Sequence, residues 1–293
     1  MSPFSLLRIA AVLSLPLLAA ACGPKTPVEV APTEVAGYEA VQDGEFFIPA
    51  VPSRYLWSDQ RRQEVAYNGP DAPGSIVVDV YSRKLYYVLE GNRAIRYAIA
   101  VGREGTAFRG TGYIGRKAEW PRWTPTANMI RTNPEAYGQF AGGVPGGLEN
   151  PLGARALYLY RGGKDTMFRI HGTIDPRSIG RATSAGCIRL FNQDIIDLFN
   201  RVGNRANVRV RTLEESIALD GPHMDDAWGR IVQDTPETRE RKAKEAAMIE
   251  QHRAEYEAEA ARIEAERLQY CEKQGIRPAL CPPAQVEAFT IEG

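Results

Sequence analysis

The sequence predicts a mainly β domain with short helices, followed by a long helical tail. Runs of β-branched and aromatic residues recur between residues 75 and 212, and Gly- and Pro-rich segments separate them. From about residue 234 the composition changes to Glu, Lys, Arg and Ala. With 293 residues, 44% of them hydrophobic, the chain is long enough for one or two domains with a sizeable core.

Residues 1–22 have the pattern of a secretion signal. The apolar run from Ile9 to Ala21 is too short to span a bilayer comfortably as a mature helix. The small residues before Cys22 resemble a bacterial lipoprotein box, in which the cysteine is lipidated. The same residues could serve ordinary signal peptidase and leave a soluble protein. We favour the lipoprotein, which predicts export to the periplasm and a lipid anchor; Gly23 favours the outer membrane.

Residues 23–73 are expected to form a tether and a packed lead-in. Residues 24–41 are rich in Pro, Val, Glu and Gly without a period, which is typical of a linker. The later part carries large apolar residues that can pack on a domain: Phe46, Phe47, Tyr55, Leu56 and Trp57.

Residues 74–213 carry the strand signals. Strands are expected over 76–80, 84–89, 94–101, 156–160, 167–170 and 207–211, with irregular connections between Gly105 and Gly153. One helix is predicted from Gln193 to Arg201, with Asn192 as its N-cap.

Residues 214–293 form a charged extension. Thr235 as N-cap and Pro236 at the first helical position predict a helix that runs to Leu268. Its apolar residues are mostly Ala, so we favour a solvated helix that ends in a disulfide loop. A coiled-coil segment that binds a protein partner is the alternative.

The chain has four cysteines: Cys22, Cys187, Cys271 and Cys281. An oxidising compartment normally pairs exposed thiols, and Cys271 and Cys281 lie close together in a segment that can turn, so we predict a disulfide between them. If Cys22 is acylated, Cys187 remains as a thiol. Such a cysteine in a secreted protein is more often reactive than accidental, with a buried, inert cysteine as the alternative.

The overall charge excludes some partners. Thirty-six basic and 36 acidic residues give a formal net charge of zero, which does not favour nucleic acid. Three widely spaced histidines and no Cys-x-x-Cys provide no metal ligand set. No phosphate loop or dinucleotide fingerprint is present, so no cofactor is expected.

Cys187 and His171 are the candidate nucleophile and base. A thiol of ordinary pKa is only a few per cent ionised near neutral pH, and an imidazole can take its proton. His171 ends a strand and Gly172 lets the chain turn, while Gly186 before Cys187 allows main-chain N–H groups to face an oxyanion. The spacing alone is weak, because a packed cysteine and a satisfied histidine are common.

The string His-Gly-Thr at 171–173, followed by Ser-x-Gly-Cys-Ile-Arg-Leu at 184–190, resembles the signature of the L,D-transpeptidase catalytic domain, the YkuD fold. The resemblance extends over roughly Ser75 to Thr212 and includes Trp123-Thr124-Pro125-Thr126 and Pro151-Leu152-Gly153. It implies a mainly β sandwich with a cleft under mobile loops.

The resemblance also implies a reaction. Cys187 would attack the carbonyl of the diaminopimelate-type third residue of a peptidoglycan stem tetrapeptide. The terminal D-alanine leaves, and an amine from another stem peptide resolves the thioester. His171 would take the thiol proton, oriented by the main-chain carbonyl of Gly172, and Arg189 would bind a substrate carboxylate.

Three further assignments keep a structural alternative. Arg189 could form a structural ion pair, although a guanidinium suits bidentate carboxylate recognition. Ser184 could stabilise a turn or donate a hydrogen bond in the site. Trp123 could belong to the core, although its loop-rich surroundings favour a lid over the cleft.

One residue departs from the family pattern. The family commonly has Ser-His-Gly-Cys, and Ala185 replaces the second histidine. The nucleophile and base survive, but substrate handling and rate are affected. Three functions therefore compete: transpeptidation, hydrolysis of the same bond type by water, and a silent cell-wall-binding lipoprotein.

Overall fold

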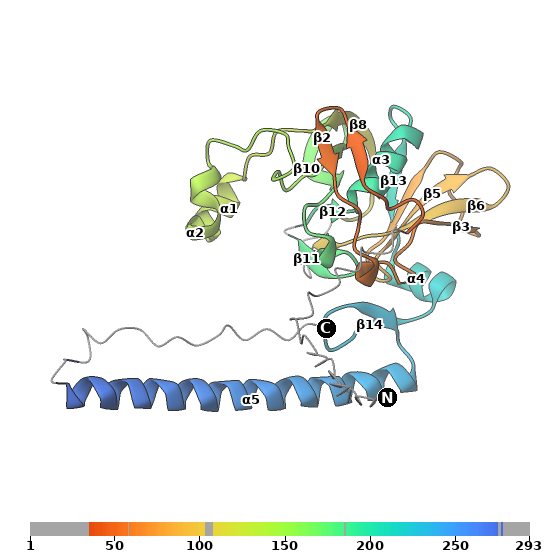
Figure 1. Ribbon diagram of the computed structural model, residues 1–293. Coiled ribbons are helices and arrows are strands. Elements are labelled where there is room, and N and C mark those ends of the chain that lie inside the picture. Colours follow the sequence, from red (N-terminus) through yellow and green to blue (C-terminus); the bar gives the residue numbers. More distant parts are fainter. Residues whose placement is uncertain (1–34, 58, 103–107, 185, 275–276, 278–293) are drawn as a thin grey trace, which may run out of the picture. The chain divides into compact units, whose positions relative to one another are not determined.

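A nine-stranded mixed sheet forms the centre of the computed structural model, which describes residues 35–57, 59–102, 108–184, 186–274 and 277 (Figure 1). The strand order is β12-β10-β9-β8-β13-β4-β5-β6-β3. These strands are β3 (Gln63–Ala66), β4 (Ile76–Asp79), β5 (Lys84–Leu89), β6 (Arg93–Ala98), β8 (Thr111–Glu119), β9 (Arg155–Arg161), β10 (Lys164–His171), β12 (Ile188–Arg189) and β13 (Asn207–Val210). The predicted fold class, mainly β with short helices and a long C-terminal helix, is confirmed.

Three two-stranded ribbons, five α-helices and three short 3-10 helices, η1 (Ser53–Tyr55), η2 (Gly138–Phe140) and η3 (Pro176–Ser178), complete the described elements. The ribbons pair β1 (Val41–Asp43) with β2 (Phe46–Ile48), β7 (Val101–Gly102) with β11 (Ala182–Ser184), and β14 (His223–Asp225) with β15 (Ile231–Gln233). The helices are α1 (Ala127–Thr132), α2 (Pro134–Tyr137), α3 (Asn192–Arg201), α4 (Leu213–Asp220) and α5 (Pro236–Lys273).

The main hydrophobic core joins the sheet to α3. Alternate residues of the strands point into it because side chains alternate across a pleated strand. Ile195 and Leu198 of α3 pack in the same cluster and are fully buried. Strand residues of this core include Ile76, Val78, Leu85, Tyr97, Ile114, Leu157, Leu159, Ile170 and Ile188.

Two local predictions are wrong. The strand expected over 94–101 divides into β6 and β7, because Ala100 leaves the hairpin and pairs with Arg189. Asn192 is the first residue of α3 and not its N-cap. Its side-chain oxygen accepts a hydrogen bond from the Ala154 N–H at 3.0 Å, so it links the helix start to the strand before it.

The expectation of irregular chain between Gly105 and Gly153 is also wrong, since β8 is a nine-residue strand. Its sequence lacks apolar alternation, and Gly112 and Gly115 weaken the strand signal. Gly115 lies at a shift in register between β8 and β9, where an added Cβ would come within 2.3 Å of the Tyr160 ring. The glycine is therefore required by packing in the strand.

The C-terminal helix begins as predicted, with Thr235 as N-cap and Pro236 in the first turn, and it ends at Lys273. Cys271 is buried and disulfide-bonded. Cys281 lies outside the described residues, so its pairing with Cys271 stays a prediction. Within the part of the chain that the structure describes, no helix combines the length and apolarity needed to cross a membrane.

The lead-in contacts the base of a long connection between β8 and β9, the excursion (residues 120–154). Asp43 accepts hydrogen bonds from the Trp120 indole at 2.9 Å and from both Arg155 Nη atoms at 2.6 and 2.9 Å. Phe46 packs on Trp120 with ring centroids 4.2 Å apart. The Trp120 N–H also bonds the Ala154 carbonyl at 2.8 Å, so one carboxylate holds both ends of the excursion.

Asp43→Ala should destabilise the fold by about 2–4 kcal/mol, because the buried Arg155 guanidinium would lose its nearest carboxylate and keep only the longer, 3.6 Å contact with the exposed Glu119. The free energy of unfolding in urea measures this loss. Glu64→Ala is the matched control, since its ion pair with Arg93 is exposed and should contribute less than about 1 kcal/mol. Equal losses in the two variants would contradict the prediction.

Candidate active site

The parallel pairing of β10 and β12 brings the two candidate catalytic residues together. Ile170 is the register partner of Ile188, and His171 is the partner of Arg189. Cys187 immediately precedes β12 and therefore lies beside Arg169, one register position before the Ile170 pair. His171 and Cys187 are thus diagonal neighbours on adjacent strands, which corresponds to about 7–8 Å between their Cα atoms.

The two isoleucines determine which face carries the site. Ile170 and Ile188 are buried in the main core. Because side chains alternate along a strand, the residues on either side of them point to the opposite face. Arg169, His171, Cys187 and Arg189 therefore share that face, which we call the site face.

The main-chain carbonyl of the next residue, Gly172, fixes the His171 ring. The ring is buried, and Nδ1 lies 2.6 Å from the Gly172 carbonyl oxygen. A carbonyl only accepts, so Nδ1 carries the proton and Nε2 keeps its lone pair. No side chain fits at position 172, because an added Cβ would lie 2.2 Å from Asn192 Oδ1.

Burial makes both members of the pair neutral. It lowers the pKa of His171 to about 3, and the positive charges of Arg189 and Arg169 act in the same direction. Burial also raises the pKa of the Cys187 thiol; a main-chain hydrogen bond from Arg169 and the charges of Arg169 and Arg189 oppose that rise. The resting pair is therefore a thiol and an imidazole, not a preformed thiolate and imidazolium.

Arg169 is a site-face residue that the sequence analysis missed. Its guanidinium bonds both Asp165 carboxylate oxygens at 2.7 and 2.8 Å and lies 4.2 Å from the centroid of the Tyr158 ring. The signal was available, because Arg169 is two residues before His171 and alternation places both on one face. A charged residue beside the candidate base could have been identified on that ground.

Arg189 is less constrained. Among the described residues, its guanidinium forms no hydrogen bond or ion pair. Burial lowers the pKa of its guanidinium, and the nearby Cys187, Asp175 and Tyr137 only partly oppose that effect. A partly buried cation without a fixed carboxylate is a suitable anchor for an anionic group.

Trp123 belongs to the excursion. Its ring packs on Tyr137 and Phe140, with centroids 6.4 and 6.0 Å away, and its backbone pairs with Val144. Figure 1 shows α1 and α2 at the far end of this excursion, apart from the strands. Tyr137 of α2 is still close enough to Arg189 for an electrostatic effect on it, so the excursion that contains Trp123 lies on the side of the domain that carries the site face.

The remaining predicted residues are partly described. Gly186 is buried with φ 133°, a conformation that glycine adopts readily, just before Cys187. The backbone of Ser184 pairs with Gly102. Ala185 and Cys22 lie outside the described residues.

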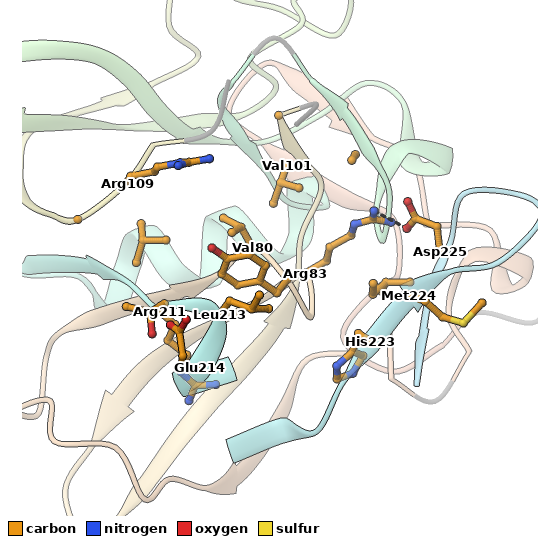
Figure 2. A pocket seen from close by; sticks show the side chains of 17 residues that line it. Val80, Arg83, Val101, Arg109, Arg211, Leu213, Glu214, His223, Met224 and Asp225 are labelled. Atoms are coloured by element: carbon orange, nitrogen blue, oxygen red, sulfur yellow. Dashed lines mark ion pairs between the residues drawn. The ribbon is translucent and has the colours of Figure 1, made fainter. Parts of the chain in front are cut away.

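A cavity of about 620 Å³ lies elsewhere, between the domain and the C-terminal extension (Figure 2). Val80, Arg83 and Val101 line it from the domain, and His223 and Asp225 line it from β14. Arg83 pairs with Asp225 across it. Neither Cys187 nor His171 is among the lining residues, so this cavity is separate from the candidate pair.

Alkylation of Cys187 by iodoacetamide should accelerate steadily as the pH rises from about 6 to 9, because only the thiolate reacts and burial keeps its population low near neutrality. The rate is measured by intact mass at each pH. A rate that is already maximal and flat between about pH 5 and 8 would instead indicate a thiolate–imidazolium pair.

Comparison with known proteins places the domain among L,D-transpeptidases. Residues 73–210 match the model of the L,D-transpeptidase catalytic domain, YkuD. The chain is 36% identical over 151 residues to "Probable L,D-transpeptidase ErfK/SrfK" of Salmonella typhimurium, covering 50% of this chain and 47% of that protein. The chain thus spans about half the length of the first curated relatives that it matches.

In two further matches, the aligned region covers a larger share of the other protein's length. A solved structure from Brucella melitensis, titled as a probable carnitine operon oxidoreductase, is 48% identical and aligns with 51% of this chain and 93% of that one, with a TM-score of 0.38. "Putative L,D-transpeptidase in ATP synthase subunits region ORF 5" of Fuscovulum blasticum is 38% identical over 138 residues, covering 45% of this chain and 68% of that protein. The similarity to the Fuscovulum blasticum protein, of which the chain covers more than two thirds, shows that the chain belongs to the L,D-transpeptidase family, and the match to the YkuD catalytic domain agrees with it.

Proposed function

We propose that this protein is a peptidoglycan L,D-transpeptidase that transfers an acyl group through Cys187. The observation that supports it best is the shared face of β10 and β12, where a thiol and a neutral imidazole lie on adjacent strands at diagonal register positions. Membership of the family agrees with this chemistry.

The resting protonation states suit a general-base mechanism. His171 Nε2 takes the thiol proton as the Cys187 sulfur attacks the carbonyl carbon between the diaminopimelate-type residue and the terminal D-alanine. The C–N bond then breaks, D-alanine leaves with the proton from the imidazolium, and a thioester remains. An amine attacks the thioester, loses its proton to His171, and the thiol is restored.

The surroundings of His171 disfavour the imidazolium at rest and stabilise it only as it forms during the reaction. At rest, burial and two guanidinium groups disfavour the imidazolium. As the imidazole gains charge, its Nδ1–H bond to the Gly172 carbonyl becomes charge-assisted and stronger. The Gly186 turn would supply main-chain N–H groups to the oxyanion.

The acyl acceptor decides between transpeptidation and hydrolysis, and both use the same nucleophile and base. Incubation with tetrapeptide muropeptides followed by mass spectrometry separates them. Cross-linked dimers support the proposed transferase, whereas shortened monomers alone support the hydrolase.

Cys187→Ala should abolish release of D-alanine, and His171→Ala should reduce it by about 10²–10⁴-fold, because the sulfur and its base are then missing. Release is followed by mass spectrometry of the products. His223→Ala is the control, since His223 lies in β14 beside the separate cavity and should leave activity unchanged. Turnover retained in Cys187→Ala would exclude this mechanism.

Arg189→Gln should raise KM for a stem tetrapeptide, with a loss of about 10-fold or more in kcat/KM, because a charge-assisted hydrogen bond to a substrate carboxylate is lost. Steady-state kinetics measure the effect. Arg177→Gln is the comparison, since Arg177 is exposed and already pairs with Asp175. An unchanged KM for Arg189→Gln would contradict the binding of a substrate carboxylate by Arg189.

We also propose export to the periplasm, with lipidation at Cys22 and an outer-membrane anchor. The sequence pattern of residues 1–22 supports this location. The mainly exposed surface of α5 is compatible with either the solvated helix or the partner-binding segment.

A further inference from the structure

A row of three large side chains crosses the site face toward Cys187. Arg116 of β8 is the register partner of Tyr158 in β9, and Tyr158 is the partner of Arg169 in β10. Arg169 lies beside Cys187 through the pairing of β10 with β12. We call Arg116, Tyr158 and Arg169 the arginine–tyrosine row.

Both arginines of the row pack on the same ring. The guanidinium carbon of Arg116 lies 3.6 Å from the centroid of Tyr158, and that of Arg169 lies 4.2 Å from it. Tyr158 is itself buried. Stacking on a fixed aromatic ring limits the conformations of each guanidinium and so preorganises its donors.

The two arginines differ in what they bind. The guanidinium of Arg169 donates two hydrogen bonds to the carboxylate of Asp165. Arg116 is exposed, and within the described ranges its guanidinium forms no hydrogen bond or ion pair. It is close enough to Asp165 to lower the pKa of that carboxyl. The two guanidinium groups of the row and the Asp165 carboxylate together carry a net charge of +1.

The position of Arg116 indicates which part of a substrate it reaches. Its guanidinium lies over Tyr158, two strands from Cys187, and adjacent strands are about 4.8 Å apart. The separation is therefore roughly 10 Å, which about three residues of extended peptide cover. A group bound at Arg116 is too far away to be the one beside the scissile bond.

We propose that Arg116 is a specificity-determining residue that binds a second substrate carboxylate, remote from the scissile bond. This inference rests on the proposed function, in which the substrate is an acidic stem peptide. The Tyr158 ring holds the exposed Arg116 guanidinium, to which a carboxylate can bind through two hydrogen bonds. Arg189 and Arg116 then contact two different carboxylates of one extended peptide.

A panel of stem tetrapeptides, each with one carboxylate replaced by a carboxamide, tests the proposal. In the wild-type protein, a carboxamide at the remote position should lower kcat/KM by about 10-fold or more, mainly through KM. In Arg116→Gln that penalty should fall below about twofold, while penalties at other positions persist, because only this contact is lost. Arg116→Lys should restore part of the discrimination, since it keeps the charge without the fork.

Arg205→Gln is the matched control. Arg205 also stacks on a tyrosine, Tyr113, at 4.4 Å, but it lies in the turn before β13, outside the arginine–tyrosine row, and its loss should leave every penalty unchanged. If Arg116→Gln retains the penalty of the wild-type protein, or if no carboxamide weakens the wild-type reaction, the assignment of Arg116 is wrong.

Binding separates this inference from the proposed function. Calorimetry with Cys187→Ala gives Kd for the carboxylate and carboxamide peptides without turnover. Failure of the wild-type protein to release D-alanine would contradict the proposed function alone. If Arg116→Gln, introduced into Cys187→Ala, leaves the ratio of Kd for the carboxamide and carboxylate peptides unchanged, the role of Arg116 is contradicted and the proposed function is not.

Discussion

The candidate site depends on two register pairs, Ile170 with Ile188 and His171 with Arg189. Burial of the two isoleucines commits one face of β10 and β12 to the core, and a slip of one residue would turn every side chain to the other face. The same hydrophobic contacts that stabilise the sheet therefore keep Cys187 and His171 on a common surface. Glycine at position 172 lets α3 pack closely against the turn behind them.

Electrostatics complement this packing. The site face places the guanidinium groups of Arg169 and Arg189 near a half-buried thiol and a buried imidazole. Their positive charge disfavours the imidazolium at rest and favours the thiolate. An anionic substrate would offset part of this charge and so ease protonation of His171. Proton transfer would then be easier when substrate is present than when the site is empty.

Much of the fold could be predicted where local pattern and tertiary structure agree. The runs that became β4, β5, β9 and β10 are rich in β-branched and aromatic residues, and Thr235 with Pro236 predicted the start of α5. Strand β8 escaped prediction because its stability comes from neighbours on both sides, while Gly115 is required by the Tyr160 ring. Asn192 looked like a helix cap, but its side chain bonds the Ala154 N–H instead.

Only part of the candidate site could be predicted, because sequence pattern does not show which distant strands pair. The signature string identified Cys187, His171 and Arg189, but a string contains no information about strands that pair across the sheet. Arg116 and Tyr158 come from β8 and β9, distant in sequence from Cys187, and only the register of the sheet aligns them. The contact of Asp43 with both ends of the excursion likewise needs tertiary structure, because residues 43, 120 and 155 are far apart in the chain.

The parallel pairing of β10 and β12 has a consequence for how such a domain can vary. Parallel neighbours need a crossover connection, and here residues 172–187 provide it. The number of residues in that crossover does not determine the separation of sulfur and imidazole, since hydrogen bonding between the strands already does. Insertions and deletions between Gly172 and Gly186 can change the rim around the nucleophile and leave the chemistry intact, so this stretch can diversify while Gly172, Gly186, Cys187 and the two strand ends cannot.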